Sequence, residues 1–474
     1  MRRAIATIVA LLMTASAQAQ GPSPDDLAAR NIQRRAVEAM IWAMPAVNTD
    51  LMLQAMLGST KAKVNEIVYW SKPANWKNQT LTPNPDSIYF MSFWNVKDGP
   101  MVLEIPPAQG GSIAGNIVTA WQMPLEDAGP EGADNGQGGK YLILPPGYRG
   151  EVPAGYIPLQ SDTFSGFALL RSNLASHTDA DVAKSVAYGK QIKLYPLGQA
   201  QNPPPTSFTD AYDVLFDSTI PYDVNFYRSL DRVVQNEPWL DRDRAMIDQL
   251  RSIGIEKGKA FNPDQTTVAI LDDAAQEAHA LLSQPYDAGF PVLNPGIHWF
   301  PAAMAEMVKA AQGGYADPDN YPVDARGVTY TLGFTGIKRL GTAQYYLMAN
   351  KDKDGRPFEG SVTYRLSVPA NAPVRNYWSV TVYDRETHAL VRNMPSASRA
   401  SISPGIQKNA DGSVDVYFGP KAPEGKEANW VPTDPTRKFE LLFRLYGPEK
   451  PLFDHSWKLP DVERFATTIG GITK

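Results

Sequence analysis

Two stretches of the chain consist of short apolar runs separated by Gly, Pro and Asn, and this pattern constrains the fold more than any other feature. The first stretch covers residues 64–172, and the second runs from residue 328 to the end of the chain. The 474 residues include 40 prolines and 36 glycines, which favours many turns and short strands over long helices. Each stretch is therefore typical of an all-β sandwich or barrel.

The apolar runs have the composition of strands. In the first stretch they read SIYFMSFW, PMVLEIPP, GNIVTAWQM, KYLILPP and TFSGFALLR. In the second stretch KFELLFRLYGP places Phe439, Leu441, Phe443 and Leu445 in alternation with Glu440, Leu442, Arg444 and Tyr446. Successive side chains of a strand point to opposite faces, so this alternation predicts a strand with two distinct faces. The run NYWSVTVYDRETHALVRN predicts a hairpin whose turn covers residues 384–387.

Two other segments have helical spacing. Residues 24–57 follow Ser23, a candidate N-cap, and place Pro24 in the first helical turn. We expect Pro45 to kink or end this helix, because proline removes a backbone donor and crowds the preceding turn. Helical spacing returns over residues 207–312.

These patterns predict an α+β protein, mainly β with helical additions, in which a helical segment bridges two β-sandwich domains. The expected parts are a signal peptide at 1–19, an N-terminal helical segment at 20–63, an N-terminal β domain at 64–205, a helical linking segment at 206–327 and a C-terminal β-sandwich domain at 328–474.

The first twenty residues, MRRAIATIVALLMTASAQAQ, have the form of a secretory signal peptide. Arg2 and Arg3 give a basic start, a short apolar run follows, and a small-x-small cleavage site ends at Ala19. The apolar run is too short to span a membrane, and no other stretch of the sequence is a candidate span. We therefore expect cleavage after Ala19 and a periplasmic or secreted mature protein.

Composition excludes several classes of function. The formal net charge is −5 and no basic block occurs, which argues against nucleic acid or an anionic membrane as a partner. The chain has no Cys, so disulfides, thiol nucleophiles, iron–sulfur clusters and Cys-ligated zinc are excluded. It has no G-x-S-x-G elbow, no G-x-G-x-x-G fingerprint and no H-E-x-x-H motif, so no cofactor or metal is indicated. The sequence leaves open whether ligands that are distant in sequence bind a metal.

Two glycine-rich motifs suggest ligand loops but fit turns better. GADNGQGGKY has Tyr141 where a phosphate loop needs Ser or Thr, so we interpret it as a turn before a strand. DKDGRPFEG has Pro357 where a calcium-binding EF-hand loop needs Gly. We interpret this second motif as a hairpin turn with Gly355 at positive φ.

Motifs in both β stretches match a known family. The N-terminal marks are TPNPDSIY, DGPMVLEIP, GGKYLILPPGY and IKLYPL, and the C-terminal marks are DKDGRPFEG, YWSVTVYD, FRLYGPE and SWKLP. The chain resembles an exported bacterial family of two linked domains of unknown function, numbered twelve fifty-four and twelve fourteen. The resemblance implies two jelly-roll-like β domains with helical additions and names no activity. The family more often has Thr or Ser where this chain has Pro85.

The motif TPNPDSIY supplies the main candidates for chemistry. Pro83 and Pro85 restrict the backbone, which would hold Asn84 and Asp86 at the mouth of the following strand. Asp86 would be a proton acceptor or ligand anchor, with Tyr89 close to the same catalytic centre. The alternative is a turn in which Asn84 and Asp86 only satisfy their own backbone.

Further ligand-binding candidates are aromatic and polar residues that could stack on or hydrogen-bond a small molecule: Asn84, Trp121, Trp378, Tyr383, Asn429, Trp430 and Arg444. Core packing and ion pairing are the alternative roles for all of them. The sequence thus predicts an exported protein that handles a small molecule or glycan by acid–base chemistry. A non-catalytic periplasmic ligand-binding or envelope-associated assembly protein is the alternative, and homo-oligomer formation stays open.

Overall fold

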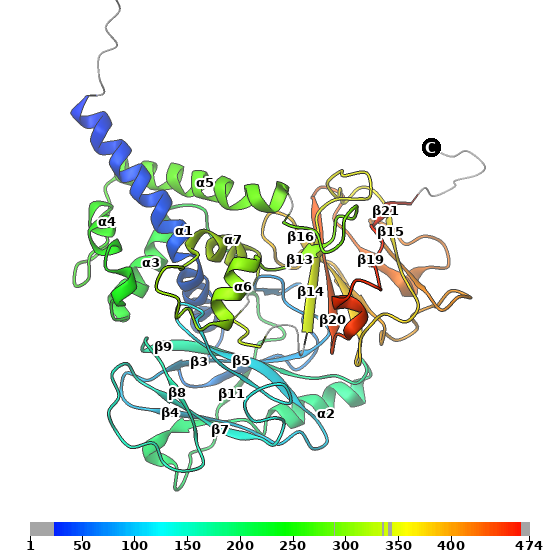
Figure 1. The fold of residues 1–474 in the computed structure, drawn as a ribbon, viewed down its shortest axis with the longest axis horizontal. Coiled ribbons are helices and arrows are strands. Elements are labelled where there is room, and N and C mark those ends of the chain that lie inside the picture. Colours follow the sequence, from blue (N-terminus) through cyan, green and yellow to red (C-terminus); the bar gives the residue numbers. More distant parts are fainter. Residues whose placement is uncertain (1–22, 289, 334–335, 340–343, 466–474) are drawn as a thin grey trace, which may run out of the picture.

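A computed structural model of the chain describes residues 23–288, 290–333, 336–339 and 344–465. The predicted signal peptide lies outside the described residues. Two β-sandwich-like domains and a helical layer make up the structure (Figure 1), and the chain order is β, helical, β after a long first helix. In the view of Figure 1 the N-terminal sandwich lies below the helices and the C-terminal sandwich lies to the right. The predicted α+β class with two sandwich-like domains is confirmed.

The N-terminal β domain pairs a six-stranded sheet, in the order β11-β1-β3-β9-β5-β6, with a four-stranded sheet, β10-β4-β7-β8. Its elements are β1 (Ile67–Tyr69), β2 (Asn78–Gln79), β3 (Ile88–Asn95), β4 (Met101–Ile105), β5 (Ile113–Thr119), β6 (Pro124–Ala128), β7 (Gly139–Leu144), β8 (Ile157–Gln160), β9 (Ser165–Ser172), α2 (Asp179–Gly189), β10 (Lys193–Pro196), η1 (Leu197–Gln199), β11 (Phe208–Asp210) and β12 (Phe216–Asp217). The five apolar runs of the first stretch form β3, β4, β5, β7 and β9.

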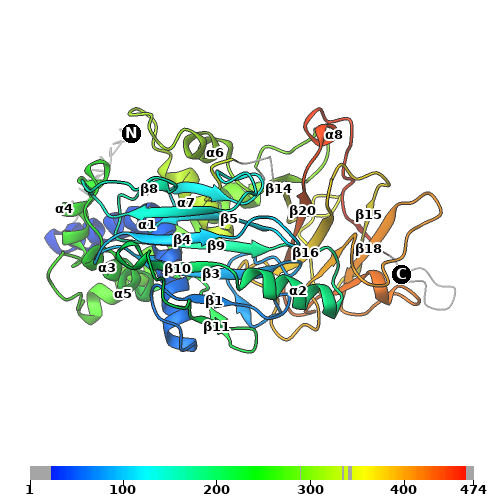
Figure 2. The same ribbon diagram turned by 90° about the horizontal axis from the view of Figure 1, so that it is seen from below.

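Both faces of β3 are buried, although they meet different neighbours. Ile88 and Phe90 belong to the core between the two sheets. Tyr89 and Met91 belong to a second core, which also contains Met56 from the first helix. The first helix of the chain therefore packs on the second face of the six-stranded sheet, and it lies behind the sheets in the view of Figure 2.

The helical layer combines the first helix with the linking segment. Its elements are α1 (Pro24–Ser59), α3 (Val224–Asn236), η2 (Asp241–Asp243), α4 (Met246–Ser252), α5 (Gln265–Ala288), α6 (Ala305–Gln312) and α7 (Val323–Leu332). The helix α1 contacts α3, α4, α5 and α7, so the two helical segments that the sequence separates pack together. Among the described helices, none combines the length and apolar character needed to cross a membrane.

Helix α1 begins as the sequence predicts and passes through its proline. The Ser23 hydroxyl accepts a hydrogen bond from the Asp26 amide at 3.1 Å and forms a capping box. Of the two expected outcomes, a kink or an end at Pro45, the helix end does not occur, because α1 continues to Ser59. Residues on both sides of Pro45 are buried, and this packing offsets the loss of one backbone hydrogen bond.

The C-terminal domain pairs a five-stranded sheet, β13-β14-β20-β16-β17, with a four-stranded sheet, β19-β18-β15-β21. Its elements are β13 (Phe300–Pro301), β14 (Gln344–Ala349), β15 (Tyr364–Val368), β16 (Trp378–Asp384), β17 (Ser398–Ala400), β18 (Val414–Gly419), η3 (Glu427–Asn429), β19 (Trp430–Pro432), β20 (Phe439–Tyr446), α8 (Lys450–Phe453) and β21 (Glu463–Arg464). The predicted hairpin after β16 is reduced to a bridge between Tyr383 and Leu390, because β16 pairs along its length with β20 and β17.

Strand β20 has the two faces that its alternation predicts, and both are buried. Phe439, Leu441, Phe443 and Leu445 lie in the core of the C-terminal sandwich. The opposite face carries Glu440, Leu442, Arg444 and Tyr446, and it lies against the helical layer and the N-terminal domain. Polar and charged groups are thus brought into the interior, between the two β domains.

Candidate functional site

The segment TPNPD lies between the two β domains and is held by its backbone. The Arg444 guanidinium donates to the Thr82 carbonyl at 2.8 Å, and the Tyr383 hydroxyl donates to the Pro83 carbonyl at 2.6 Å. Thr82 has a φ of 38°, in the left-handed region. The C-terminal domain therefore fixes the segment that enters β3.

Asn84 stabilises its own turn and also bonds to the C-terminal domain. Its Oδ1 accepts the Asp86 amide at 3.0 Å, which is the local turn expected from the sequence. Its Nδ2 donates to the Tyr446 hydroxyl at 2.6 Å, and its own amide donates to the Tyr89 hydroxyl at 2.7 Å. Asn84 thus ties tyrosines of both β domains together.

Two buried arginines, Arg171 and Arg444, lie at this junction between the β domains. Arg171 on β9 is the cross-strand partner of Tyr89, and its guanidinium carbon lies 5.5 Å from the centre of the Tyr89 ring. Arg444 on β20 is the cross-strand partner of Tyr346, and its guanidinium carbon lies 5.2 Å from the centre of the Tyr346 ring. The exposed fractions are 7% for Arg171 and 1% for Arg444, and neither Nε atom has a hydrogen-bond partner.

Neither arginine is neutralised by a carboxylate. All 50 Asp and Glu side chains of the sequence fall within the described residues. In this part of the chain, no ion pair joins an acidic side chain to Arg171 or Arg444, whose charges meet tyrosines, a threonine and a backbone carbonyl instead. A buried charge without a counter-charge is costly, so this pair of arginines is the most distinctive feature of the junction.

Tyrosines complete the arrangement, which we call the tyrosine–arginine cluster: Tyr89, Arg171, Tyr346, Tyr377, Tyr383, Arg444 and Tyr446. The rings of Tyr377 and Tyr446 stack with their centres 4.5 Å apart. Burial raises the pKa of Tyr377, Tyr383 and Tyr446 above the ordinary range of a phenol. These hydroxyls therefore stay neutral, and those of Tyr377 and Tyr383 donate to the backbone carbonyls of Asp86 and Pro83.

A small cavity, the inner cavity, opens within the cluster. Its volume is about 50 Å³, and its lining includes Asn84, Tyr89, Arg171, Tyr346 and Arg444. Apolar side chains such as Met52, Met91, Leu169 and Leu442 form the rest of its wall. One water molecule needs roughly 10–15 Å³ of cavity volume, so the inner cavity has room for a few waters or for one carboxylate group.

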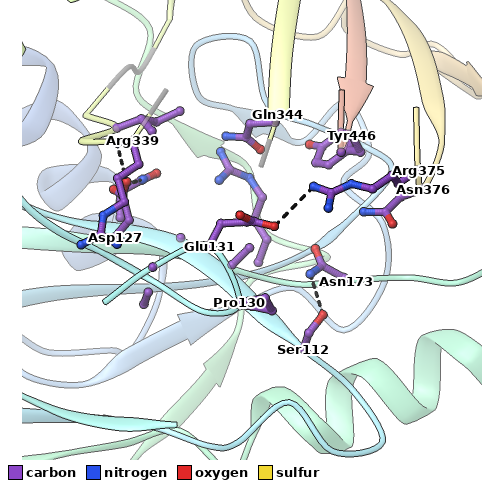
Figure 3. Close-up of a pocket in the computed structure, with 18 residues that line it drawn as sticks. Ser112, Asp127, Pro130, Glu131, Asn173, Arg339, Gln344, Arg375, Asn376 and Tyr446 are labelled. Carbon is purple, nitrogen blue, oxygen red and sulfur yellow. Dashed lines mark hydrogen bonds and ion pairs between the residues drawn. The ribbon is translucent and has the colours of Figure 1, made fainter. Parts of the chain in front are cut away.

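A larger outer cavity of about 320 Å³ adjoins the inner cavity and lies between the two β domains (Figure 3). Arg171 lines both cavities. An ion pair of 3.4 Å between Arg375 and Glu131 crosses from one domain to the other. The Arg339 amide donates to Asp127 at 2.8 Å, and burial raises the pKa of the Asp127 carboxyl. The outer cavity is thus polar and carries charges of both signs.

Asp86 lies on a different cavity, the Asp86 cavity, of about 340 Å³. The carboxylate is 3% exposed, and it accepts a hydrogen bond from the Ser398 hydroxyl at 2.7 Å. The His177 Nε2 atom lies 3.6 Å from the other carboxylate oxygen and has no hydrogen-bond partner. Trp76 and Tyr212 form half-buried walls of this cavity.

The structure brings some of the predicted residues together and separates others. Asn84, Tyr89, Tyr383 and Arg444 meet in or beside the inner cavity. Asp86 does not join them there, although it is adjacent in sequence. Asp86 and Tyr89, which the sequence places near one centre, thus line two separate cavities.

Four predicted ligand-binding residues have structural neighbours and line none of the cavities above. Trp121 packs on Trp42 in the helical layer, and Trp378 stacks on Phe443 in the C-terminal core. The Asn429 amide group donates to the carbonyls of Gln407 and Asp415, and the Trp430 indole donates to the Gly419 carbonyl. These contacts agree with the packing and pairing roles considered as alternatives.

Sequence reasoning missed Arg171, Tyr346 and Tyr446. Arg171 stands at the end of the run SGFALLRS, which is otherwise apolar or small. A lone charge in a strand whose two faces are both buried is a signal that could have found it. Tyr346 carries no such signal, because tyrosine is common at the surface of a β domain.

The described residues contain no cluster of three or more His, Asp or Glu side chains placed to hold a metal ion. In DKDGRPFEG, Gly355 has a φ of 75°. The buried Asp352 carboxylate accepts the amides of Asp354 and Arg356 at 3.0 Å each. This motif is a turn, as the sequence predicts.

Fold and site together define a two-domain β-sandwich protein with a positively charged, tyrosine-lined cavity between its domains. Comparison with known families gives the same division of the chain. Residues 64–196 match the protein of unknown function DUF1254, and residues 343–450 match the protein of unknown function DUF1214. The chain thus carries these two domains of unknown function in this order.

A solved structure shares the fold at low sequence identity. The VPA0106 protein from Vibrio parahaemolyticus is 17% identical with a TM-score of 0.56, over 92% of this chain and 100% of that protein. An uncharacterised protein from Burkholderia cenocepacia is 12% identical with a TM-score of 0.39, over 92% of this chain and 94% of that one. No curated protein matches the chain in sequence.

Proposed function

We propose that the protein binds a small carboxylate in the inner cavity, between the guanidinium groups of Arg171 and Arg444. The observation that carries this proposal is the burial of two guanidinium groups without a carboxylate partner beside a cavity. A bound anion would supply the missing counter-charge. Hydrogen bonds to charged groups contribute about 1.5–3 kcal/mol each, which suits a site that selects for charge.

A carboxylate fits the site better than other small anions do. Its two oxygens match the planar donor fork of a guanidinium, and the inner cavity admits a group of about that size. The Tyr89 and Tyr346 side chains line the same cavity and bring two hydroxyl groups to its wall. The protein's own groups at this point are donors, so the site supports binding more directly than proton abstraction.

The test is an NMR titration of the folded protein with acetate and propionate, with choline as a cationic control. Arg171→Met and Arg444→Met are each expected to weaken propionate binding by at least about tenfold. Arg392→Met is the matched control, because Arg392 is half-exposed and paired with Asp217. Unchanged propionate affinity in both cavity variants would contradict the proposal.

A second candidate function is acid–base chemistry by Asp86 on a small neutral molecule or glycan. A buried carboxylate beside an unpartnered histidine nitrogen and two aromatic walls favours it. Asp86→Asn keeps the shape and an acceptor for Ser398. We expect it to leave the melting temperature unchanged and to abolish turnover or binding of neutral oligosaccharides, while propionate still binds. Oligosaccharide turnover or binding that survives Asp86→Asn would remove this candidate.

We further propose that the protein acts outside the cytoplasm, on the basis of the N-terminal pattern that ends at Ala19. Mass spectrometry of the fractionated host would test this. A mature N-terminus at Gln20 in the periplasm or medium is expected, and an intact Met1 in the cytoplasm would contradict it.

A further inference from the structure

A fourth cavity near the junction has a mostly apolar lining. Its volume is about 380 Å³, and its lining includes Phe290, Met304, Val308, Tyr345, Tyr346 and Phe453. The lining comes from α6, from α8 and from both faces of strand β14, since it includes the consecutive residues Tyr345 and Tyr346. Phe453 is 47% exposed and packs edge-on against Tyr345 with ring centres 5.6 Å apart. An apolar hollow of this size, with an exposed aromatic ring in its lining, is typical of a ligand site.

The apolar cavity and the inner cavity share wall residues. Tyr346 and Ala302 line both of them. Because these residues belong to β14 and to the segment that follows β13, the two cavities adjoin at one edge of the five-stranded sheet. A molecule that reaches both would lie along Tyr346.

Tyr346 contacts both the tyrosine–arginine cluster and the apolar cavity. Its hydroxyl lies 3.4 Å from the Tyr446 hydroxyl, within the tyrosine–arginine cluster. The Arg444 guanidinium lies over its ring at 5.2 Å. Tyr346 also lines the apolar cavity. A ligand with one charged end and one apolar end would therefore meet matching surroundings on the two sides of this residue.

We infer that the ligand is an amphipathic monocarboxylate, such as a medium-chain fatty acid. Its carboxylate would bind between Arg171 and Arg444, and its apolar chain would fill the apolar cavity beside Tyr346. This inference rests on the proposed anion site and names the class of molecule that the site takes. The carboxylate head supplies the counter-charge, and burial of the chain supplies most of the affinity.

The test is a calorimetric titration of the full chain with straight-chain carboxylates from propionate to decanoate, below their micelle concentrations. Each added methylene is expected to tighten binding about fourfold until the apolar cavity is full. Alcohols of the same lengths are expected to bind at least about tenfold more weakly, because they leave the arginines without a counter-charge.

Two variants separate the two ends of the ligand. Val308→Trp should fill the apolar cavity, so decanoate affinity should fall to that of propionate while propionate affinity stays unchanged. Val152→Trp is the control, because Val152 is exposed and lines none of the cavities described above. Arg171→Met should weaken every carboxylate and leave the alcohols unaffected. The chain-length series on the unaltered protein decides the question if Val308→Trp does not fold.

The outcomes distinguish this inference from the proposed function. Propionate binding that depends on Arg171, with no gain for decanoate, would overturn the amphipathic ligand and leave the anion site standing. Equal affinity for alcohols and carboxylates, with no effect of Arg171→Met, would overturn the anion site.

Discussion

Strand β20 carries two buried charges on the same face, and their surroundings differ sharply. Glu440 has both oxygens occupied, one by the His388 ring at 2.7 Å and one by the Tyr286 hydroxyl at 2.5 Å. Four residues along the strand, Arg444 meets hydroxyls and a carbonyl, has an unpartnered Nε and lines a cavity. Glu440 lines none of the cavities described above.

The difference shows which buried charges point to a ligand. A charge whose partners are all supplied by the protein, as at Glu440, holds the fold together and needs nothing further. A charge that lacks a counter-charge beside empty space, as at Arg444 and Arg171, costs stability unless something else occupies that space. Burial of a charge alone is therefore not the mark of a site. The mark is burial together with an incomplete set of partners.

The largest effect on stability is expected from Glu440→Ala. The change leaves His388 and Tyr286 without their acceptor in a buried position, and breaking such a pair typically costs about 3–5 kcal/mol. Urea unfolding of the variant would measure the loss. Glu386→Ala is the matched control, since Glu386 lies in the adjoining turn and is mostly exposed. A loss of stability no greater than that of the control would mean that the buried Glu440 does not stabilise the fold, which would contradict the contrast with Arg444.

The pH dependence of carboxylate binding should follow the ligand and not the protein. Burial raises the pKa of Tyr377, Tyr383 and Tyr446, so these groups stay neutral up to about pH 10, and arginine stays charged throughout. Propionate affinity should thus be constant from about pH 6 to about pH 10. It should fall about tenfold per pH unit below the pKa of the ligand, because the neutral acid does not supply a counter-charge. A drop between pH 6 and pH 8 would instead implicate a histidine.

In contrast to Glu440→Ala, Arg171→Met should not destabilise the free protein. Arg171 is buried, its Nε has no partner, and no carboxylate depends on it in the described residues. Replacing such a charge with an apolar side chain of similar length is expected to leave the free energy of unfolding unchanged or to raise it by about 1–2 kcal/mol. Chemical unfolding without added carboxylate measures this. A loss of several kcal/mol would mean that Arg171 serves the fold.

The smallest effect is expected from Glu131→Ala. This change breaks the 3.4 Å ion pair with Arg375 across the outer cavity, and both side chains are substantially exposed. Pairs of this kind contribute at most about 1 kcal/mol and are screened by salt. Thermal unfolding at low and high salt should therefore differ little from the unaltered protein. A large destabilisation would show that the two β domains depend on this contact.

Much of the fold follows from local sequence. The apolar runs become β3, β4, β5, β7 and β9, and the capping pattern at Ser23 starts α1. Pro45 does not end its helix, because a helix buried by its neighbours tolerates one missing hydrogen bond. The alternation in β20 predicts two faces but not what covers the second one. A polar-looking face is expected to meet solvent, whereas here it meets another domain.

The candidate site is harder to derive, because it is assembled from distant segments. Asn84 and Arg444 are 360 positions apart, and only the docking of the two β domains brings them to one cavity. Asp86 is close to Asn84 in sequence, yet it lies on another cavity, because the chain turns at residues 85–86 between the two side chains and the strand. Sequence reasoning could identify the residues of TPNPDSIY as candidates but could not assign them to separate cavities.

The most direct test of the central claim is a crystal structure of the protein with saturating propionate. We expect the carboxylate in the inner cavity, with its oxygens within hydrogen-bonding distance of the guanidinium groups of both Arg171 and Arg444. An inner cavity that holds only water under these conditions, with both arginines in unchanged positions, would contradict the account.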